Sequence, residues 1–234
     1  MIQAVLFDLD DTLYPQAAFL DVAWTTVAAA AAAYGIAPEP FHAALTAVAA
    51  EGSDRGQIID RALWRIGADG VPVEPLVAAF RACVPAKLSP YPGVREALAR
   101  LRTVVRTGLV TDGETGGQRA KVRALGLEDL FDVIVYSDDL GRDRRKPHPA
   151  PFHRALARLA VPADAAVMIG DRPDKDVAGA AAAGLRAIRV RTGEYAERPD
   201  QPSPWRSASD AVAAIALLGT PTAPAARRGR TPAR

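Results

Sequence analysis

Five short apolar runs are spaced along the chain, and each is long enough for a buried β-strand. Most of them are almost continuously apolar rather than alternating, which is typical of parallel strands covered by helices on both faces. The predicted strands are Ile2–Asp8, Val104–Thr111, Phe131–Ser137, Ala165–Asp171 and Arg186–Arg191.

Helical patterns separate the later four strands and follow the last one. The first, Glu114–Leu125, begins with a possible capping box from Thr115 to Gln118 and stops at Gly126. The others are Pro151–Leu159, a helix from about Asp174 to Gly184, and Ser209–Leu218. Alternating strands and helices with right-handed crossovers predict a three-layer α/β sandwich around a parallel sheet, similar to a Rossmann fold.

The first connection breaks this alternation, because nearly a hundred residues separate the first two predicted strands. One crossover needs only a few dozen residues, so we expect an inserted all-helical bundle over residues 15–88. Its predicted helices are Ala17–Tyr34, Pro40–Ala50, Arg55–Ile66 and Glu74–Ala82. The α/β core is then expected over residues 1–14 and 89–218.

Residues 219–234 contain four arginines, no acidic residue and several prolines and alanines. Such a segment cannot bury a core, and we expect it to be a disordered tail, whose role stays open. Without these arginines the formal net charge falls from +2 to −2. The body therefore offers no basic face for a nucleic acid.

The remaining composition is that of an ordinary globular protein, with 49% hydrophobic and 24% charged residues. Polar residues interrupt every apolar run before it reaches the length of a membrane span, and the amino terminus has no signal-peptide pattern. Cys83 is the single cysteine and cannot form an internal disulfide. A cytoplasmic protein without a membrane partner is the expectation.

Acidic and hydroxyl residues follow three of the predicted strands. Asp8 and Asp10 end the first, Thr111 with Asp112 and Gly113 ends the second, and Asp171 ends the fourth, with Asp176 five residues later. The carboxyl ends of parallel strands meet at one edge of the sheet, where ligands bind. We therefore expect these side chains to line one site.

Several carboxylates close together are unfavourable without cations, since a like-charge pair at 4 Å costs about 4 kcal/mol at an effective dielectric near 20. Oxygen ligands favour a hard ion, and Mg²⁺ fits best. Lys146, which precedes Pro147 after the third strand, is a candidate second cation. Taken alone, the Asp8 and Asp10 pair also fits a strand-end turn, and Lys146 also fits a solvated loop.

In combination, these residues resemble a known family. Asp8-Leu-Asp10-Asp-Thr12, Thr111, Lys146-Pro147, and Gly170-Asp171 with Asp176 resemble the four motifs of the haloacid dehalogenase superfamily in their usual order. The resemblance covers about residues 2–191. The inserted bundle is similar to the type 1 helical cap of subfamily IA.

The resemblance implies a role for each matching residue. Asp8 would be the nucleophile that forms an aspartyl-phosphate, and Asp10 the general acid and then the general base. Thr111 and the turn of Asp112 and Gly113 would bind the phosphoryl group, with Lys146 neutralising charge. Mg²⁺ would be held by Asp8, the Asp10 carbonyl, Asp171 and Asp176. Asp174 and Asp176 could exchange roles, one serving the metal and the other capping the helix.

Two positions refine this implication. Asp10 favours a phosphatase, because an alkoxide leaving group needs an acid and a halide does not. Asp112 stands where the family often has Asn, so we expect its side chain to point away from the phosphate.

The favoured function is a Mg²⁺-dependent phosphatase acting on a small phosphorylated metabolite, such as a sugar phosphate, a nucleotide or a phosphoglycolate-like acid. The alternatives are a dehalogenase or a phosphomutase with the same nucleophile, or a non-catalytic phosphate-binding regulatory module. The particular ester and the oligomeric state stay open.

Overall fold

The computed structural model describes residues 1–52 and 56–219. The chain divides into two compact units, each described here by itself. The first comprises residues 1–13, 90–112 and the chain from Leu127 onward, and the second comprises residues 14–89 and 113–126.

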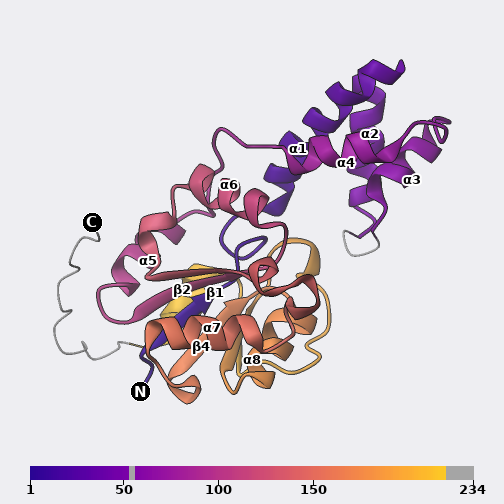
Figure 1. Ribbon diagram of the computed structural model, residues 1–234. Coiled ribbons are helices and arrows are strands. Elements are labelled where there is room, and N and C mark those ends of the chain that lie inside the picture. Colours follow the sequence, from indigo (N-terminus) through magenta and orange to yellow (C-terminus); the bar gives the residue numbers. More distant parts are fainter. Residues whose placement is uncertain (53–55, 220–234) are drawn as a thin grey trace. The chain divides into compact units, whose positions relative to one another are not determined.

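The first unit is built around one six-stranded sheet in which every pair is parallel, in the order β3-β2-β1-β4-β5-β6 (Figure 1). Its strands are β1 (Ala4–Phe7), β2 (Arg106–Thr111), β3 (Val133–Tyr136), β4 (Ala166–Gly170), β5 (Arg186–Val190) and β6 (Arg206–Ala208). The predicted parallel α/β architecture is confirmed. The five predicted strands form with narrower bounds, and β6 is an additional, short strand at the edge.

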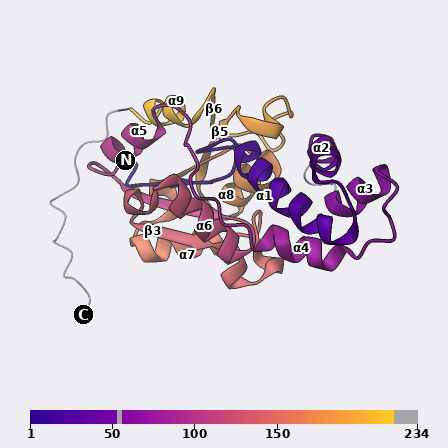
Figure 2. The same ribbon diagram turned by 90° about the horizontal axis from the view of Figure 1, so that it is seen from above.

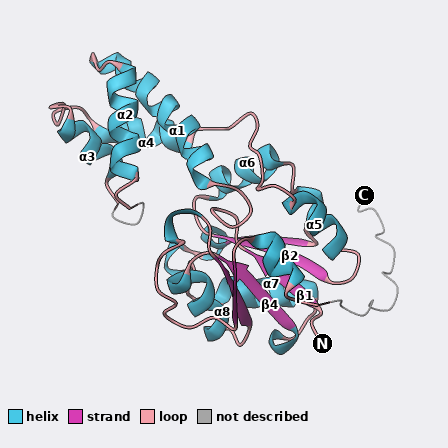
Figure 3. Ribbon diagram, turned by 180° about the vertical axis from the view of Figure 1, so that it is seen from behind, coloured by secondary structure: helices cyan, strands magenta, loops and turns pink. Residues whose placement is uncertain are grey.

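Helices cover the sheet (Figure 3). The helices of this unit are α5 (Val94–Leu101), α7 (Ala150–Leu159), α8 (Ala178–Ala182) and α9 (Ala211–Ala216). One face packs against α7 and α8 through a core that includes Leu6, Met168 and Phe152. The helices α5 and α9 contact each other, and α9 also contacts β4, β5 and β6. Helix α5 was not predicted from the sequence.

One predicted detail of the helices is wrong. Helix α6 (Thr115–Leu125) begins at Glu114, whose carboxylate accepts hydrogen bonds from the N–H groups of Gly116 and Gly117, so Thr115 does not form the predicted capping box. The helix predicted from about Asp174 to Gly184 is confirmed, as a π-helical segment over Pro173–Val177 that continues into α8.

The second unit is helical and contains α1 (Gln16–Ala31), α2 (Pro38–Ala49), α3 (Ile58–Arg65) and α4 (Val73–Arg81) together with α6 (Figure 2). Helix α1 packs against α2 and α4, and α2 packs against α3. The four predicted bundle helices form at closely similar positions. Arg55, at the predicted start of the third, lies outside the described residues, as does the predicted tail beyond Gly219.

The stretch Gln16–Tyr34 is long and apolar enough, by composition, to cross a membrane. One side of it packs into the core of the second unit, where Trp24, Val27 and Ala31 are buried with Phe41 and Leu76.

Candidate active site

The sheet order brings the predicted site residues to one edge of the first unit. Strand β1 lies between β2 and β4, with Phe7 level with Leu109 and Ile169. Asp8 continues this register, since its N–H donates to the carbonyl of Ile169 at 2.9 Å. Thr111 ends β2 and Asp171 follows the end of β4. The carboxyl ends of these three adjacent strands therefore meet around Asp8.

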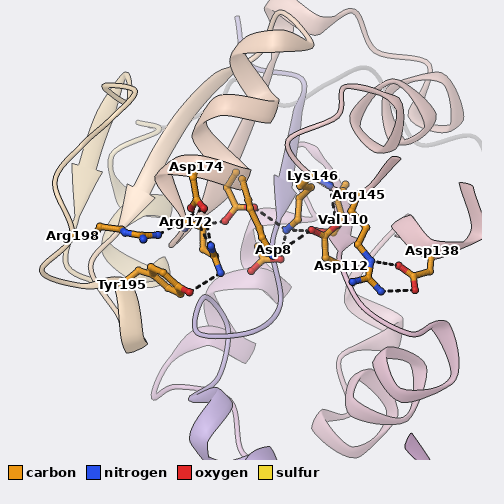
Figure 4. A network of polar contacts seen from close by, with 12 residues as sticks. Asp8, Val110, Asp112, Asp138, Arg145, Lys146, Arg172, Asp174, Tyr195 and Arg198 are labelled. Carbon is orange, nitrogen blue, oxygen red and sulfur yellow. Dashed lines mark hydrogen bonds and ion pairs between the residues drawn. The ribbon is translucent and has the colours of Figure 1, made fainter. Parts of the chain in front are cut away.

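Lys146 is the central cation of this site (Figure 4). Its ammonium contacts Asp8 Oδ1, donates to Asp176 Oδ1 at 2.8 Å and donates to the Val110 carbonyl at 3.2 Å. The side chain is buried, with 5% of the residue exposed. All three protons of the ammonium thus have an acceptor, which is what a buried lysine requires. Lys146 is not a solvated loop lysine.

The loop that carries Lys146 is held at Lys146 itself and at the preceding residue. The N–H of Lys146 donates to Asp112 Oδ1 at 3.1 Å, and the preceding Arg145 pairs with Asp138 through two nitrogens at 2.5 and 2.7 Å. The other Asp112 oxygen lies 3.8 Å from the ammonium of Lys175. The Asp112 carboxylate therefore binds the Lys146 loop, and Lys175 offsets its charge.

Asp8, Asp171 and Asp176 form a buried acidic cluster. Each offers a carboxylate oxygen within 4.8 Å of the others, and all three residues are at most 7% exposed. Thr12 donates its hydroxyl to Asp171 at 3.4 Å. Three carboxylates around one ammonium leave two negative charges uncompensated by these four groups when all are ionised.

The electrostatics of the cluster shift its pKa values. Burial raises the pKa of Asp8 to about 7, with Asp176 and Asp10 adding to the rise and Lys146 opposing it. Burial and the neighbouring Asp176 and Asp8 carboxylates likewise hold the pKa of Asp171 well above its usual range. Burial lowers the pKa of Lys146, but Asp176 and Asp8 outweigh it and keep this pKa above its ordinary value. Lys146 is therefore a permanent cation. The raised pKa values of Asp8 and Asp171 mean that the acidic cluster favours binding of a further cation or of protons.

The donor set fits a hard divalent cation such as Mg²⁺, because every group of the cluster offers oxygen. Both oxygens of Asp176 are already engaged, one by Lys146 and the other by the N–H of Arg172 at 3.0 Å. Asp8 and Asp171 are therefore the better candidates for direct ligands, and Asp176 suits contact through a water.

The metal-free protein is expected to lose stability as pH rises from about 4 to 7. Over that range folded Asp8, with a pKa near 7, keeps a proton that the unfolded chain, with a pKa of 3.8, releases. Folding then takes up protons, so the free energy of unfolding falls with pH. Mg²⁺ replaces those protons, and its stabilising effect is expected to be larger at about pH 8 than at about pH 5.

Thermal unfolding at the two pH values, with EDTA and with Mg²⁺, measures this. Asp8→Asn is the control, since it removes the titrating carboxyl and should flatten the dependence. A Mg²⁺-induced rise in Tm that is equal at both pH values would contradict the assignment.

Gly170 makes room for Asp176. A Cβ at Gly170 would lie 2.4 Å from Asp176 Cγ, closer than real contacts allow. Asp174, by contrast, pairs with Arg172 through two hydrogen bonds of 3.1 and 2.7 Å outside the cluster, with 47% of its side chain exposed. The geometry therefore brings Asp176, rather than Asp174, to Lys146.

Gly170→Ala is expected to push Asp176 away from Lys146 and to destabilise the protein by about 1–3 kcal/mol, as at other overpacked positions. Chemical denaturation of the variant beside Gly70→Ala, at a glycine with nothing within 4 Å of the added carbon, measures the difference. Equal stabilities would show that the Asp176 position tolerates the methyl group.

Of the other predicted residues, Asp10 and Thr111 belong to the first unit. Asp10 is half-buried and contributes to the raised pKa of Asp8. Thr111 is buried, with 1% exposed, at the end of β2. Gly113 belongs to the second unit. The catalytic and ligand roles of all eight residues remain predictions.

The sequence analysis assigned no role to Asp11, Arg189 or the segment Thr192–Asp200, which are joined to one another and to Asp171 by hydrogen bonds. Asp11 adopts a left-handed backbone (φ 56°) and is 7% exposed. Arg189 is fully buried within β5. The one available signal was an arginine inside an otherwise apolar strand, which requires buried partners.

The chain matches known proteins along most of its length. A family model described as haloacid dehalogenase-like hydrolase matches residues 2–184. The chain is 38% identical over 203 residues to a glyceraldehyde 3-phosphate phosphatase of Methanopyrus kandleri, covering 83% of this chain and 86% of that protein. It is 34% identical to a phosphoglycolate phosphatase of Rhodospirillum rubrum, covering 100% of this chain and 98% of that protein.

A solved structure also matches. The 2-haloacid dehalogenase of Pseudomonas syringae superposes with a TM-score of 0.62 at 28% identity, covering 93% of this chain and 98% of that one. Phosphatases and a dehalogenase thus both share this fold.

Proposed function

The chain belongs to the haloacid dehalogenase-like hydrolases, and from this membership we propose that it is a Mg²⁺-dependent phosphatase that hydrolyses a small phosphate monoester through an aspartyl-phosphate. The observation that carries the proposal is the buried contact of Lys146 with Asp8 and Asp176. It holds one carboxylate oxygen of Asp8 in place beside a permanent cation.

In the first step Asp8 attacks phosphorus. A carboxylate oxygen of Asp8 forms a bond to phosphorus while the bond to the ester oxygen breaks, and the leaving oxygen takes a proton from Asp10. Asp8 must be ionised for this step. Lys146 favours that ionised form against the burial that raises its pKa.

In the second step Asp10, now ionised, takes a proton from water. The water oxygen bonds to phosphorus, the acyl-phosphate bond breaks, and Asp8 is regenerated as inorganic phosphate leaves. Asp10 is half-buried, and its charge interacts with that of Asp8.

Charge on the phosphoryl oxygens is offset by positioned donors. Lys146 supplies the cation, the hydroxyl of Thr111 and the backbone of Asp112 and Gly113 supply hydrogen bonds, and together they stabilise a transition state with dispersed negative charge. When bound, Mg²⁺ adds charge neutralisation at the phosphoryl group. Asp8, the Asp10 carbonyl and Asp171 would hold it, with Asp176 acting through water.

The proposed substrate is a small phosphorylated metabolite. The relatives named for glyceraldehyde 3-phosphate and phosphoglycolate act on three- and two-carbon phosphate esters, as their names state. We place the protein in the cytoplasm, without nucleic-acid or membrane partners. The helical second unit is proposed to be the cap that selects the leaving group.

The proposal is tested by release of inorganic phosphate from a chromogenic phosphate ester, followed by a panel of glyceraldehyde 3-phosphate, phosphoglycolate, a sugar phosphate and a nucleotide. We expect turnover in the presence of Mg²⁺. It should be lost when EDTA is added and should return with excess Mg²⁺. Full activity in EDTA, or no hydrolysis of any ester, would contradict the proposal.

A parallel arm addresses the dehalogenase named among the structural relatives. A 2-haloacid is incubated with the protein under the same conditions, and free halide is measured. Halide release without phosphate release would show that the protein is a dehalogenase rather than a phosphatase. We expect phosphate release alone, because Asp10 provides the acid that an alkoxide requires.

A further inference from the structure

Arg189 is the largest fully buried side chain among the described residues. A guanidinium in a protein interior is very costly unless its N–H groups have acceptors. Here Nη1 donates to the Arg198 carbonyl at 2.6 Å and to Asp200 Oδ1 at 2.5 Å, and Nη2 donates to the Tyr195 carbonyl at 2.5 Å. Three of its acceptors thus lie in one segment, Thr192–Asp200, which we name the strap.

The fourth acceptor of Arg189 belongs to the acidic cluster. Its Nε donates to the backbone carbonyl of Asp171 at 3.3 Å. One buried side chain therefore ties the strap to the loop that carries Asp171. The exposed Arg191, two residues after Arg189, also donates to Asp200, at 2.7 Å. This second contact further fixes the carboxyl end of the strap.

The strap also contacts the loop that carries Asp8 and Asp10. The Thr192 hydroxyl donates to the carbonyl of Asp11, and the N–H of Glu194 donates to Asp11 Oδ2 at 3.2 Å. Gly193 lies between these donors with φ +67°, and a Cβ there would fall 2.0 Å from Asp11 Cγ. Only a glycine allows the strap to approach Asp11 this closely.

A third contact reaches the residue after Asp171. The Tyr195 hydroxyl accepts from Arg172 Nη1 at 2.8 Å, and the Arg172 guanidinium stacks on the Tyr195 ring at 3.9 Å (Figure 4). The backbone N–H of the same Arg172 binds Asp176. The strap therefore contacts both acidic loops at residues adjacent to the proposed metal ligands.

We propose that Arg189 is a positioning residue, which acts through the strap to fix the spacing between the Asp8–Asp11 loop and the Asp171–Asp176 loop, and thereby the affinity of the site for its divalent cation. The inference deepens the proposed function and rests on it for the identity of the cation. Arg189 would act indirectly, because its side chain donates to the Asp171 backbone carbonyl and to the strap rather than to the metal. Partners that orient ligands in this way are worth about 10- to 100-fold in metal affinity or activity.

Two variants and two matched controls test the proposal. Arg189→Lys keeps the buried charge but loses the fork that reaches four acceptors, and Arg186→Lys changes an arginine of the same strand that stacks on Trp205 instead. Thr192→Val removes one hydroxyl that binds Asp11, with little change of volume, and Thr103→Val removes an exposed hydroxyl bound to the local Arg100 carbonyl. Thr192→Ser restores the hydroxyl.

The first readout is the dissociation constant for Mg²⁺ alone, from isothermal titration calorimetry of the full chain. We expect weakening of about tenfold in Thr192→Val and Arg189→Lys, recovery in Thr192→Ser, and values within about twofold of wild type in both controls. We also expect kcat to fall at saturating substrate and subsaturating Mg²⁺, with KM for the ester nearly constant. Unchanged Mg²⁺ affinity in a folded Thr192→Val variant would overturn the proposal.

The second readout does not depend on metal or turnover. Hydrogen–deuterium exchange of the metal-free protein is expected to accelerate in peptides covering residues 8–13 and 170–176 of Thr192→Val and Arg189→Lys, and not in the controls. Acceleration confined to the substituted segment would also overturn the proposal. If wild type hydrolyses no ester, the proposed function fails, while this exchange pattern still tests the strap.

Discussion

Asp8→Asn is expected to lower the rate of phosphate release by a factor on the order of 10⁴ or more, because a neutral amide cannot form the covalent intermediate. The position is otherwise well suited to the change. The amide oxygen can still accept from Lys146, and the backbone bond to Ile169 is unaffected. A loss of activity therefore reports on chemistry rather than on unfolding.

The stability of Asp8→Asn separates these two causes. Asp8 is buried beside Asp171 and Asp176, so the substitution removes one of three clustered negative charges. In metal-free buffer at about pH 8 the variant should unfold at no lower temperature than wild type. Asp174→Asn, at a nearby acid outside the cluster, should retain nearly all activity. An active Asp8→Asn variant would exclude Asp8 as the nucleophile.

Lys146→Met is expected to destabilise the metal-free protein by about 3–5 kcal/mol, the usual cost of removing one partner from a buried ion pair. Three carboxylates within 4.8 Å would remain without their ammonium. They can reduce the cost by binding protons, so the deficit should shrink as pH falls. The rate of phosphate release should also fall, on the order of 10³-fold, through loss of a cation at the phosphoryl group.

Chemical denaturation and steady-state kinetics measure the two effects. Lys175→Met is the matched control, because its ammonium is partly exposed and lies 3.8 Å from Asp112 rather than in the cluster. It should change both quantities little. If Lys146→Met were as stable and as active as Lys175→Met, the buried contact that carries the proposed function would have no functional importance.

The sequence predicted five strands of the central parallel sheet well, because parallel strands buried on both faces have a strong apolar signal, while their order comes from the structure. Once β1, β2 and β4 are adjacent, the ends of these strands place Asp8, Thr111 and Asp171 at one edge without further information. Lys146 was predicted from its place in the motif order, and the structure supplies its contacts with Asp8 and Asp176.

Other features depend on tertiary contacts that have no local signal. The choice between Asp174 and Asp176 depends on the π-helix over Pro173–Val177 and on the space at Gly170, neither of which an ordinary helical pattern reveals. Arg189 is paired by backbone carbonyls 6–18 residues away. Strand β6 has three residues, two of them exposed, so its apolar signal is too weak.

The most direct test of the account is to trap the covalent intermediate. The protein is mixed with substrate and Mg²⁺, quenched in acid during turnover, reduced with borohydride and digested for mass spectrometry. A phosphorylated aspartate is reduced to homoserine by this treatment, and we predict homoserine at position 8 in samples that received substrate, and not in samples without it. Homoserine at a different aspartate, or its absence while phosphate is being released, would contradict the assignment of Asp8.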